Sequence, residues 1–197
     1  MNNRIPIQDH LALPWRVHQL AVDYEVEDVW RFPVVLRDEH DLATFRDQMT
    51  SGIGTMNRFN PARVLLALRV AIGRRLGWDQ VEAGTGRQLR ARYAAVEGLT
   101  GGEKVLSGAE FAEVYDLGNE YLSEIENRTV QAALHLGRVP TGDGTATVHL
   151  TVYVKPKGWL GRMYMWAIKP FRLWVVYPAI LRAASRRWAE YVAAEAS

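Results

Sequence analysis

Cysteine is absent from this chain of 197 residues. Disulfides, a thiolate nucleophile and cysteine-ligated metals are therefore excluded, and the chain suits a reducing compartment. Long apolar runs are missing as well. The longest charge-free runs near the C-terminus, Met163–Ile168 and Leu173–Leu181, are much shorter than the ~20 apolar residues of a membrane span. Residues 1–10 lack the apolar stretch of a signal peptide, so we expect a cytoplasmic protein.

Acidic residues are missing between Lys155 and Ala189, where eight lysines and arginines occur, although the net charge of the chain is only +2. Seven aromatic residues from Trp159 to Trp188 are interleaved with these cations. Such a segment can lie on a membrane surface, but more often it is a core helix whose basic side chains extend into solvent. We favour the core helix. We predict no nucleic-acid partner, because these aromatics alternate with buried positions instead of forming an exposed stacking platform.

Familiar catalytic motifs are also missing, including the Gly-x-Ser-x-Gly elbow, His-Glu-x-x-His and the phosphate-binding loop. Gly52–Gly54 and Gly84–Gly86 lack the third glycine of a dinucleotide fingerprint, so we predict no cofactor. His135 and His149 are expected to face each other on the solvated side of two adjacent strands. No third ligand is fixed beside them, and we predict no metal site.

Alternation of apolar and polar residues dominates Phe111–Lys155 and predicts an antiparallel meander of four strands. Alternation on one face is typical of a sheet that is covered on one side and solvated on the other. The polar, solvated face is expected to include Glu113, Glu124, His135 and His149. The covered face is expected to consist of Ala112, Val114, Tyr121, Ser123, Ile125, Val130, Ala132, Leu134, Leu136, Val148, Leu150, Val152 and Val154.

A first strand is predicted at Tyr24–Phe32, with Tyr24, Val26, Asp28, Trp30 and Phe32 on the covered side. Two smaller helices are expected to follow this strand. One runs over Glu39–Met49 after Asp38, and the other starts at an Asn60 N-cap and ends at Gly77. Residues 78–108 are rich in glycine and are a candidate lid or insertion, with a short helix at Arg87–Tyr93.

The cover for the apolar face is predicted to be one long helix over Gly158–Ala194. Pro170 and Pro178 should kink it, because each removes a backbone donor and clashes with the preceding turn. The fold predicted from these elements is α+β, with a curved antiparallel sheet wrapped around a long kinked C-terminal helix. Residues 1–197 are expected to form one domain.

Several segments of the chain resemble a bacterial family described only as a domain of unknown function. That family is similar to the START-like (SRPBCC, helix-grip) class, in which a sheet grips a C-terminal helix around a hydrophobic cavity. The resemblance implies the fold and a ligand-sized interior, and it implies no reaction and no catalytic residue. The segments that carry it are Trp15–His18, Glu27–Trp30, Glu124–Val130, Leu134–Gly137, Leu160–Tyr164, Ile168–Phe171 and Tyr177–Pro178.

Polar residues on the covered face are the candidate site, because buried polar groups need partners. Asp28, Tyr121 and Ser123 are the candidate catalytic residues, and Asp28 is the best candidate for a general base. Arg128 and Lys169 are expected to reach them. A structural network of the same residues is the alternative. The residues expected to line a binding site are Trp30, Tyr121, Ser123, Ala132, Leu134, Leu150, Tyr164, Ile168 and Phe171.

Three functions remain open from the sequence. The first is binding of a hydrophobic or amphipathic small molecule between the sheet and the C-terminal helix. The second is an enzyme of the cyclase or dehydratase type that uses Asp28, Tyr121 or Ser123 for proton transfer. The third is a peripheral membrane or protein-interaction module that uses the basic aromatic helix.

Overall fold

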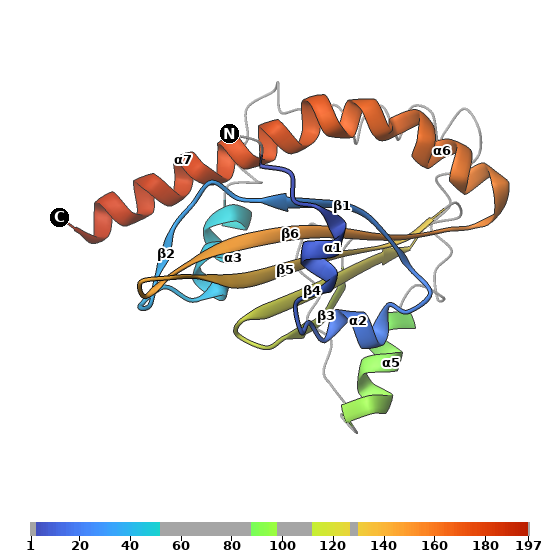
Figure 1. The fold of residues 1–197 in the computed structure, drawn as a ribbon, viewed down its shortest axis with the longest axis horizontal. Helices are drawn as coiled ribbons and strands as arrows, with labels where there is room; N and C mark the ends of the chain where they lie inside the picture. Colours follow the sequence, from blue (N-terminus) through green and yellow to red (C-terminus); the bar gives the residue numbers. More distant parts are fainter. Residues whose placement is uncertain (1–2, 52–87, 98–111, 127–129, 197) are drawn as a thin grey trace.

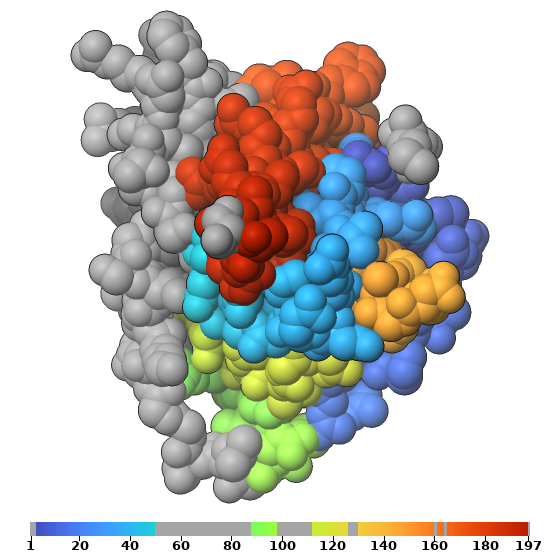
Figure 2. Space-filling model, turned by 90° about the vertical axis from the view of Figure 1, so that its left-hand side faces the viewer, coloured from blue at the N-terminus to red at the C-terminus, as the bar shows by residue number. Residues whose placement is uncertain are grey.

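The protein has a sheet between two layers of helices (Figure 1). The computed structural model describes residues 3–51, 88–97, 112–126 and 130–196. One layer is the long C-terminal helix, and the other contains the short helices α1 (Ile7–Leu11), α2 (Val17–Leu20) and α5 (Gln88–Glu97). Seen end-on, the C-terminal helix lies at the top, the turn of the longest hairpin in the middle and α5 at the bottom (Figure 2).

The described residues form a six-stranded antiparallel sheet in the order β1-β6-β5-β4-β3, with β2 pairing to β6. The predicted fold class is therefore confirmed. The meander is also confirmed, with each strand pairing to the next along the chain. The strands are β1 (Glu25–Arg31), β2 (Leu36–Arg37), β3 (Ala112–Asp116), β4 (Glu120–Glu126), β5 (Val130–Gly142) and β6 (Thr145–Pro156).

A tight turn at Asp143-Gly144 joins β5 to β6. Both residues have positive φ, 54° and 65°, which is the conformation of a two-residue hairpin turn that matches strand twist. Across β4 and β5 the observed register pairs Ser123 with Leu134 and Tyr121 with Leu136. A two-residue turn at residues 127–128, which the sequence favours, would pair Ser123 with Ala132. The observed register differs from it by two residues and so leaves the side chains of β4 and β5 on their predicted faces.

Two bulges change the faces that simple alternation predicts. In β1 the register shifts between Val26 and Asp28, so Tyr24 and Val26 pack on the side of the sheet away from the C-terminal helix. In β3 the register shifts between Glu113 and Tyr115, and Val114 packs on that same side. An extra residue reverses the alternation between the two sides of a bulge, so the predicted inward positions of Tyr24, Val26 and Val114 were wrong. The inward position of Ala112 was wrong for the same reason, because Ala112 pairs with Glu124 of the other face.

The C-terminal helix has three parts, α6 (Gly158–Phe171), a π-helical turn η1 (Arg172–Val176) and α7 (Tyr177–Glu195). The rod arches over the sheet (Figure 1). Pro170 and Pro178 flank η1, and the Tyr177 N–H bonds to the carbonyl of Arg172, five residues earlier. The predicted proline break is thus accommodated by a wider turn instead of a gap in the helix.

The helix-facing core joins the sheet to α7 and to α3 (Leu42–Ser51). Phe32, Phe45 and Trp188 meet edge to face in this core. The first predicted small helix is confirmed but starts later, because Asp41 rather than Asp38 caps it with a 2.6 Å bond from the Thr44 N–H to Oδ1. The predicted helix from Asn60 to Leu76 lies outside the described residues.

The other sheet face is buried, and the prediction of a solvated polar face was wrong. Helices α1, α2 and α5 cover it, and His135, Glu120, Glu124 and His149 are all at most 5 % exposed. Of the candidate lid at residues 78–108, the described part is α5, which covers this face with Leu89 fully buried. The remainder of that range lies outside the described residues.

Candidate functional site

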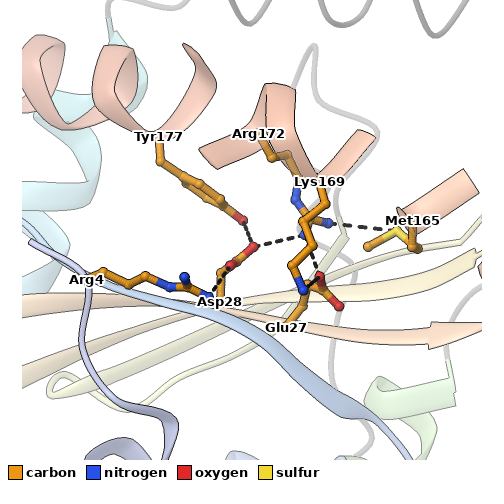
Figure 3. Close-up of polar contacts among 7 residues, drawn as sticks. All are labelled: Arg4, Glu27, Asp28, Met165, Lys169, Arg172 and Tyr177. Atoms are coloured by element: carbon orange, nitrogen blue, oxygen red, sulfur yellow. Dashed lines mark hydrogen bonds and ion pairs between the residues drawn. The ribbon is translucent and has the colours of Figure 1, made fainter. Parts of the chain in front are cut away.

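The bulge in β1 brings two consecutive acidic side chains to the same partner. In a regular strand Glu27 and Asp28 would point to opposite faces of the sheet. Here both reach Arg172, whose Nη2 donates to Glu27 Oε1 at 2.8 Å and to Asp28 Oδ2 at 2.9 Å. Figure 3 shows the two carboxylates below the guanidinium. Sequence alternation predicted only Asp28 inside, because a bulge has no reliable signature in a strand without glycine.

Arg172 stands at the first position of the π-helical turn and is 8 % exposed. A buried arginine needs paired partners, and the two acids supply them. Met165 Sδ lies 3.8 Å from the other terminal nitrogen, Nη1. Single π-helical turns are often found at functional sites. Sequence analysis missed Arg172, although it occupies a basic position between two prolines of the predicted helix.

Tyr177 and Lys169 complete the cluster. The Tyr177 hydroxyl donates to Asp28 Oδ2 at 3.1 Å, and its ring stacks on Trp30 at 4.8 Å. Lys169, expected to reach Asp28, Tyr121 or Ser123, instead lies with its Nζ 3.4 Å from Oε1 of the neighbouring Glu27. Arg4 Nη2 approaches Asp28 Oδ1 at 3.6 Å from the N-terminal segment. Arg128, predicted to reach the same groups, lies outside the described residues.

Burial dominates the electrostatics of the cluster. It raises the pKa of Asp28 above its usual value, although the charge of Arg172 and the bond from Tyr177 oppose the shift. Burial and the nearby Asp28 charge raise the pKa of Tyr177 as well. Tyr177 is therefore a hydrogen-bond donor at neutral pH, and Asp28 is a carboxyl group whose charged form is disfavoured by its surroundings.

Some polar atoms of the cluster are buried without a hydrogen bond. Among the described residues, Asp28 Oδ1, Arg172 Nε and Trp30 Nε1 have no hydrogen-bond partner. Buried polar atoms in native proteins nearly always have a partner in protein, water or ligand. Asp28 Oδ1 has only the 3.6 Å ion-pair contact with Arg4, so the cluster keeps a weakly engaged acceptor, and at least one donor without a hydrogen bond, for a small polar group.

The three candidate catalytic residues do not form one constellation. One row of paired residues crosses the sheet from β1 through β6 and β5 to β4, and it consists of Asp28, Val152, Leu134 and Ser123. Three strand spacings separate Asp28 from Ser123, about 14 Å. Tyr121 pairs with Leu136 in the neighbouring row, and the Arg46 guanidinium lies 4.6 Å over its ring. Asp28 is thus grouped with Glu27 and Arg172, whereas Tyr121 lies in a separate group with Arg46 and Asp116.

The predicted lining residues divide between the core and its edge. Trp30, Tyr121, Leu134 and Leu150 belong to the core that packs on α3 and α7. Ala132 and Ile168 belong to a smaller cluster with Val130, Val154 and Met165, which also includes Val152. Phe171 is half-buried outside both clusters, and the Tyr164 side chain is outside the described part of the structure.

Central apolar side chains of this face are incompletely covered. Ala132 and Leu134 on β5, and Val152 on β6, remain partly exposed. These strands lie inside the sheet, and the C-terminal helix crosses the same face. Such positions are usually fully buried. The partly exposed row Val152–Leu134 starts directly beside Asp28.

A second polar cluster lies on the opposite face of the sheet. Glu120 accepts bonds from the backbone N–H groups of Arg16 at 2.8 Å and Val17 at 2.9 Å, and from the Tyr115 hydroxyl. His135 Nε2 lies 3.2 Å from the same carboxylate. Burial alone would raise the pKa of Glu120, but the bonds from His135 and Tyr115 lower it to about 2. Glu120 therefore anchors the start of α2 to β4.

Buried histidines surround this anchor. His10 Nε2 is 2.7 Å from the Tyr153 hydroxyl, and its ring meets those of His18 and His135 at 5.2 and 5.4 Å. His135 pairs with Thr151, while His149 pairs with Gly137, so these two histidines are diagonal neighbours, and the predicted direct pairing was wrong. Within the described residues no three His, Asp or Glu side chains are placed so as to hold a metal ion.

The protein has an α+β fold in which a long helix arches over a curved antiparallel sheet. A buried ion-pair cluster lies between the sheet and this helix. The chain belongs to the family described as "protein of unknown function (DUF2867)", whose model matches residues 20–179. No curated protein matches the chain, and no solved structure matches it. No helix within the described residues is long and apolar enough to cross a membrane.

Proposed function

We propose that this protein binds a small amphipathic molecule between the sheet and the C-terminal helix. One observation carries the proposal: partly exposed apolar side chains, Val152 and Leu134, run across the middle of the sheet from a buried polar cluster with spare hydrogen-bonding atoms. The apolar part of the molecule would lie along this row. Its polar end would meet Asp28 and Arg172. An apolar wall with a few convergent polar groups is the usual makeup of a small-molecule site.

The chemistry of the cluster favours an uncharged head group. The buried carboxylate of Asp28 is matched by the buried Arg172, while Lys169 and Arg4 approach the acidic pair from side chains that are about half exposed. A further charge inside the cluster would therefore be buried without a buried partner. Asp28 Oδ1 is an acceptor without a hydrogen bond, since Arg4 approaches it only to 3.6 Å, and Arg172 Nε is a donor without one. A hydroxyl or carboxamide group, which both donates and accepts, complements this pair.

The resemblance to START-like, helix-grip proteins supports the same proposal, because that class encloses hydrophobic molecules between sheet and helix. The likeness is one of fold, and function has to be argued from the site. A START-like relationship is thus part of the proposal.

Probe binding tests the proposal. N-phenyl-1-naphthylamine is a neutral amphipathic fluorophore with one N–H donor, and we expect it to bind with enhanced emission. Val152→Phe fills the row from β6 and should weaken binding at least about tenfold. The matched control is Val139→Phe, the same substitution at a partly buried valine on the other sheet face, which should leave probe binding unchanged.

Thermal melts of both variants decide how the binding result is interpreted. If Val152→Phe melts like the wild type and still binds the probe equally well, the site between sheet and helix is wrong. Equal loss of binding in Val139→Phe would mean that the probe reports general loosening of the fold.

Proton transfer by Asp28 is a second candidate function, favoured by the raised pKa of this buried carboxyl group. The ligand extracted from the protein would be incubated with fresh protein in deuterated water. Deuterium incorporation that Asp28→Asn abolishes would support an enzyme of the cyclase or dehydratase type. A ligand that exchanges no hydrogen would leave binding as the function.

A further inference from the structure

Tryptophan side chains project into solvent from the outer side of α6 and η1. Trp159, Trp166 and Trp174 are 70 %, 78 % and 79 % exposed, and Met163 between them is 47 % exposed. Large aromatic side chains are normally among the most buried on average. The core-helix prediction therefore holds for Tyr177 and Trp188, which are buried, and was wrong for these three tryptophans.

These residues form one line along the rod. Positions 159, 163, 166, 170 and 174 recur every three or four residues, which keeps them on one side of a helix. Met165, Ile168 and Arg172, on the opposite side, face the sheet. We call Trp159, Met163, Trp166 and Trp174 the tryptophan stripe. None of its members belongs to the clusters that hold the fold together.

The charge beside the stripe has one sign. Arg162 is exposed between Trp159 and Trp166, and the Lys169 side chain is 46 % exposed one turn further on. No acidic residue occurs from Lys155 to Ala189. Tryptophan with lysine and arginine, and without acids, is the composition of helices that lie in the interface of anionic membranes. A second copy of the chain would instead bring two basic surfaces together, which is unfavourable.

We propose that the tryptophan stripe docks on an anionic lipid surface, with α6 lying parallel to the membrane plane. The indole rings would enter the headgroup region, while Arg162 would meet lipid phosphates. The proposal is independent of the binding site between sheet and helix, since the stripe faces away from it.

Vesicle flotation tests the proposal. The wild type should float with vesicles of phosphatidylcholine containing about one third phosphatidylglycerol, and not with phosphatidylcholine alone. Flotation should decrease in about 0.5 M sodium chloride, where surface charges are screened. The triple variant Trp159→Ser, Trp166→Ser, Trp174→Ser should lose at least about tenfold in partition coefficient, and Arg162→Glu should lose about tenfold.

The chain offers matched controls. Val22→Ser, Val35→Ser, Val96→Ser removes three exposed apolar side chains from other elements, and Arg37→Glu reverses an exposed charge on β2. Both controls should float like the wild type. A wild type that stays unbound at low salt overturns the proposal, as does equal flotation of the tryptophan variant. Sedimentation that shows a wild-type dimer and a monomeric tryptophan variant would assign the stripe to self-association instead.

Discussion

Asp28 and Glu27 illustrate how one extra residue in a strand determines the chemistry of the site. The bulge between Val26 and Asp28 lets both acids share Arg172. Alternation from Trp30 backwards predicted the inward position of Asp28, because that part of β1 is regular. The same pattern placed Glu27 on the opposite face of the strand. Alternation within a strand cannot indicate that Asp28 pairs with Arg172, which lies 144 positions later in the chain.

Replacing Arg172 should destabilise the fold. Arg172→Met leaves two carboxylates without their main partner, one of them fully buried, and should lower the free energy of unfolding by about 3 kcal/mol. Arg172→Lys should lose less, because the charge remains without the planar fork. Urea denaturation measures both. Arg162→Met, at an exposed position of α6, is the control, and an equally small effect of Arg172→Met would contradict the assigned role.

At the scale of elements, the covering of the outer sheet face was the largest difference from expectation. The polar residues of that face are polar because they hold helices: Glu120 accepts backbone bonds at the start of α2, and Glu124 accepts bonds from the N–H groups of Leu89 and Arg90 in α5. A sequence pattern cannot distinguish a glutamate that faces water from one that caps a helix packed over the sheet.

Glu120→Ala should release α2 from the sheet. Two backbone N–H groups and a buried histidine lose their partner, so we expect a loss of about 3 kcal/mol in unfolding free energy. Hydrogen exchange should rise first in residues 16–21. Glu113→Ala, on β3, is the comparison. Unchanged exchange in α2 would show that its docking depends on the apolar contacts of Val17 and Leu20 alone.

Gly137 permits the close packing of the N-terminal segment on β5. A Cβ atom at this position would lie 2.8 Å from the indole of Trp15, so Gly137→Ala should cost about 2 kcal/mol. Trp15→Phe shortens the ring system. The double variant should therefore lose less stability than the sum of the losses in the two single variants. Additive losses in this double-mutant cycle would contradict a direct clash.

At the scale of the whole molecule, the buried histidines make stability depend on pH. Burial, together with neighbouring histidines, lowers the pKa of His10 to about 3, and burial with the Arg31 charge lowers that of His149 to about 4. In the unfolded chain histidines titrate near 6.5. The unfolded state therefore binds more protons below that pH, and stability is lost as the pH falls from about 6.5 towards about 4 for His149 and about 3 for His10.

Denaturation at about pH 7 and about pH 5 should differ by about 1–2 kcal/mol for each of these histidines. His149→Leu removes a side chain with no hydrogen-bond partner among the described residues and should reduce this pH dependence. An unchanged slope would mean that His149 titrates normally in the folded protein.

The sequence predicted the architecture because its main signals are global and regular. Alternation through β4, β5 and β6 and the apolar face of the C-terminal helix each extend over many residues, so Leu134 and Leu150 were both assigned to the covered face. The features that the sequence did not predict depend on single residues. The bulge in β1, the π-helical turn that places Arg172, and the exposure of Trp166 each arise from packing between distant segments.

Native mass spectrometry of the protein purified from cells would show directly whether a molecule is bound between the sheet and the C-terminal helix. We expect a discrete added mass on the wild type that disappears on denaturation, and its loss in Val152→Phe but not in Val139→Phe. Organic extraction would then give a small neutral amphipathic molecule with a hydroxyl or carboxamide group. A wild type at its bare chain mass that also fails to bind the neutral probe, or an added mass unaffected by Val152→Phe, would contradict binding between the sheet and the C-terminal helix.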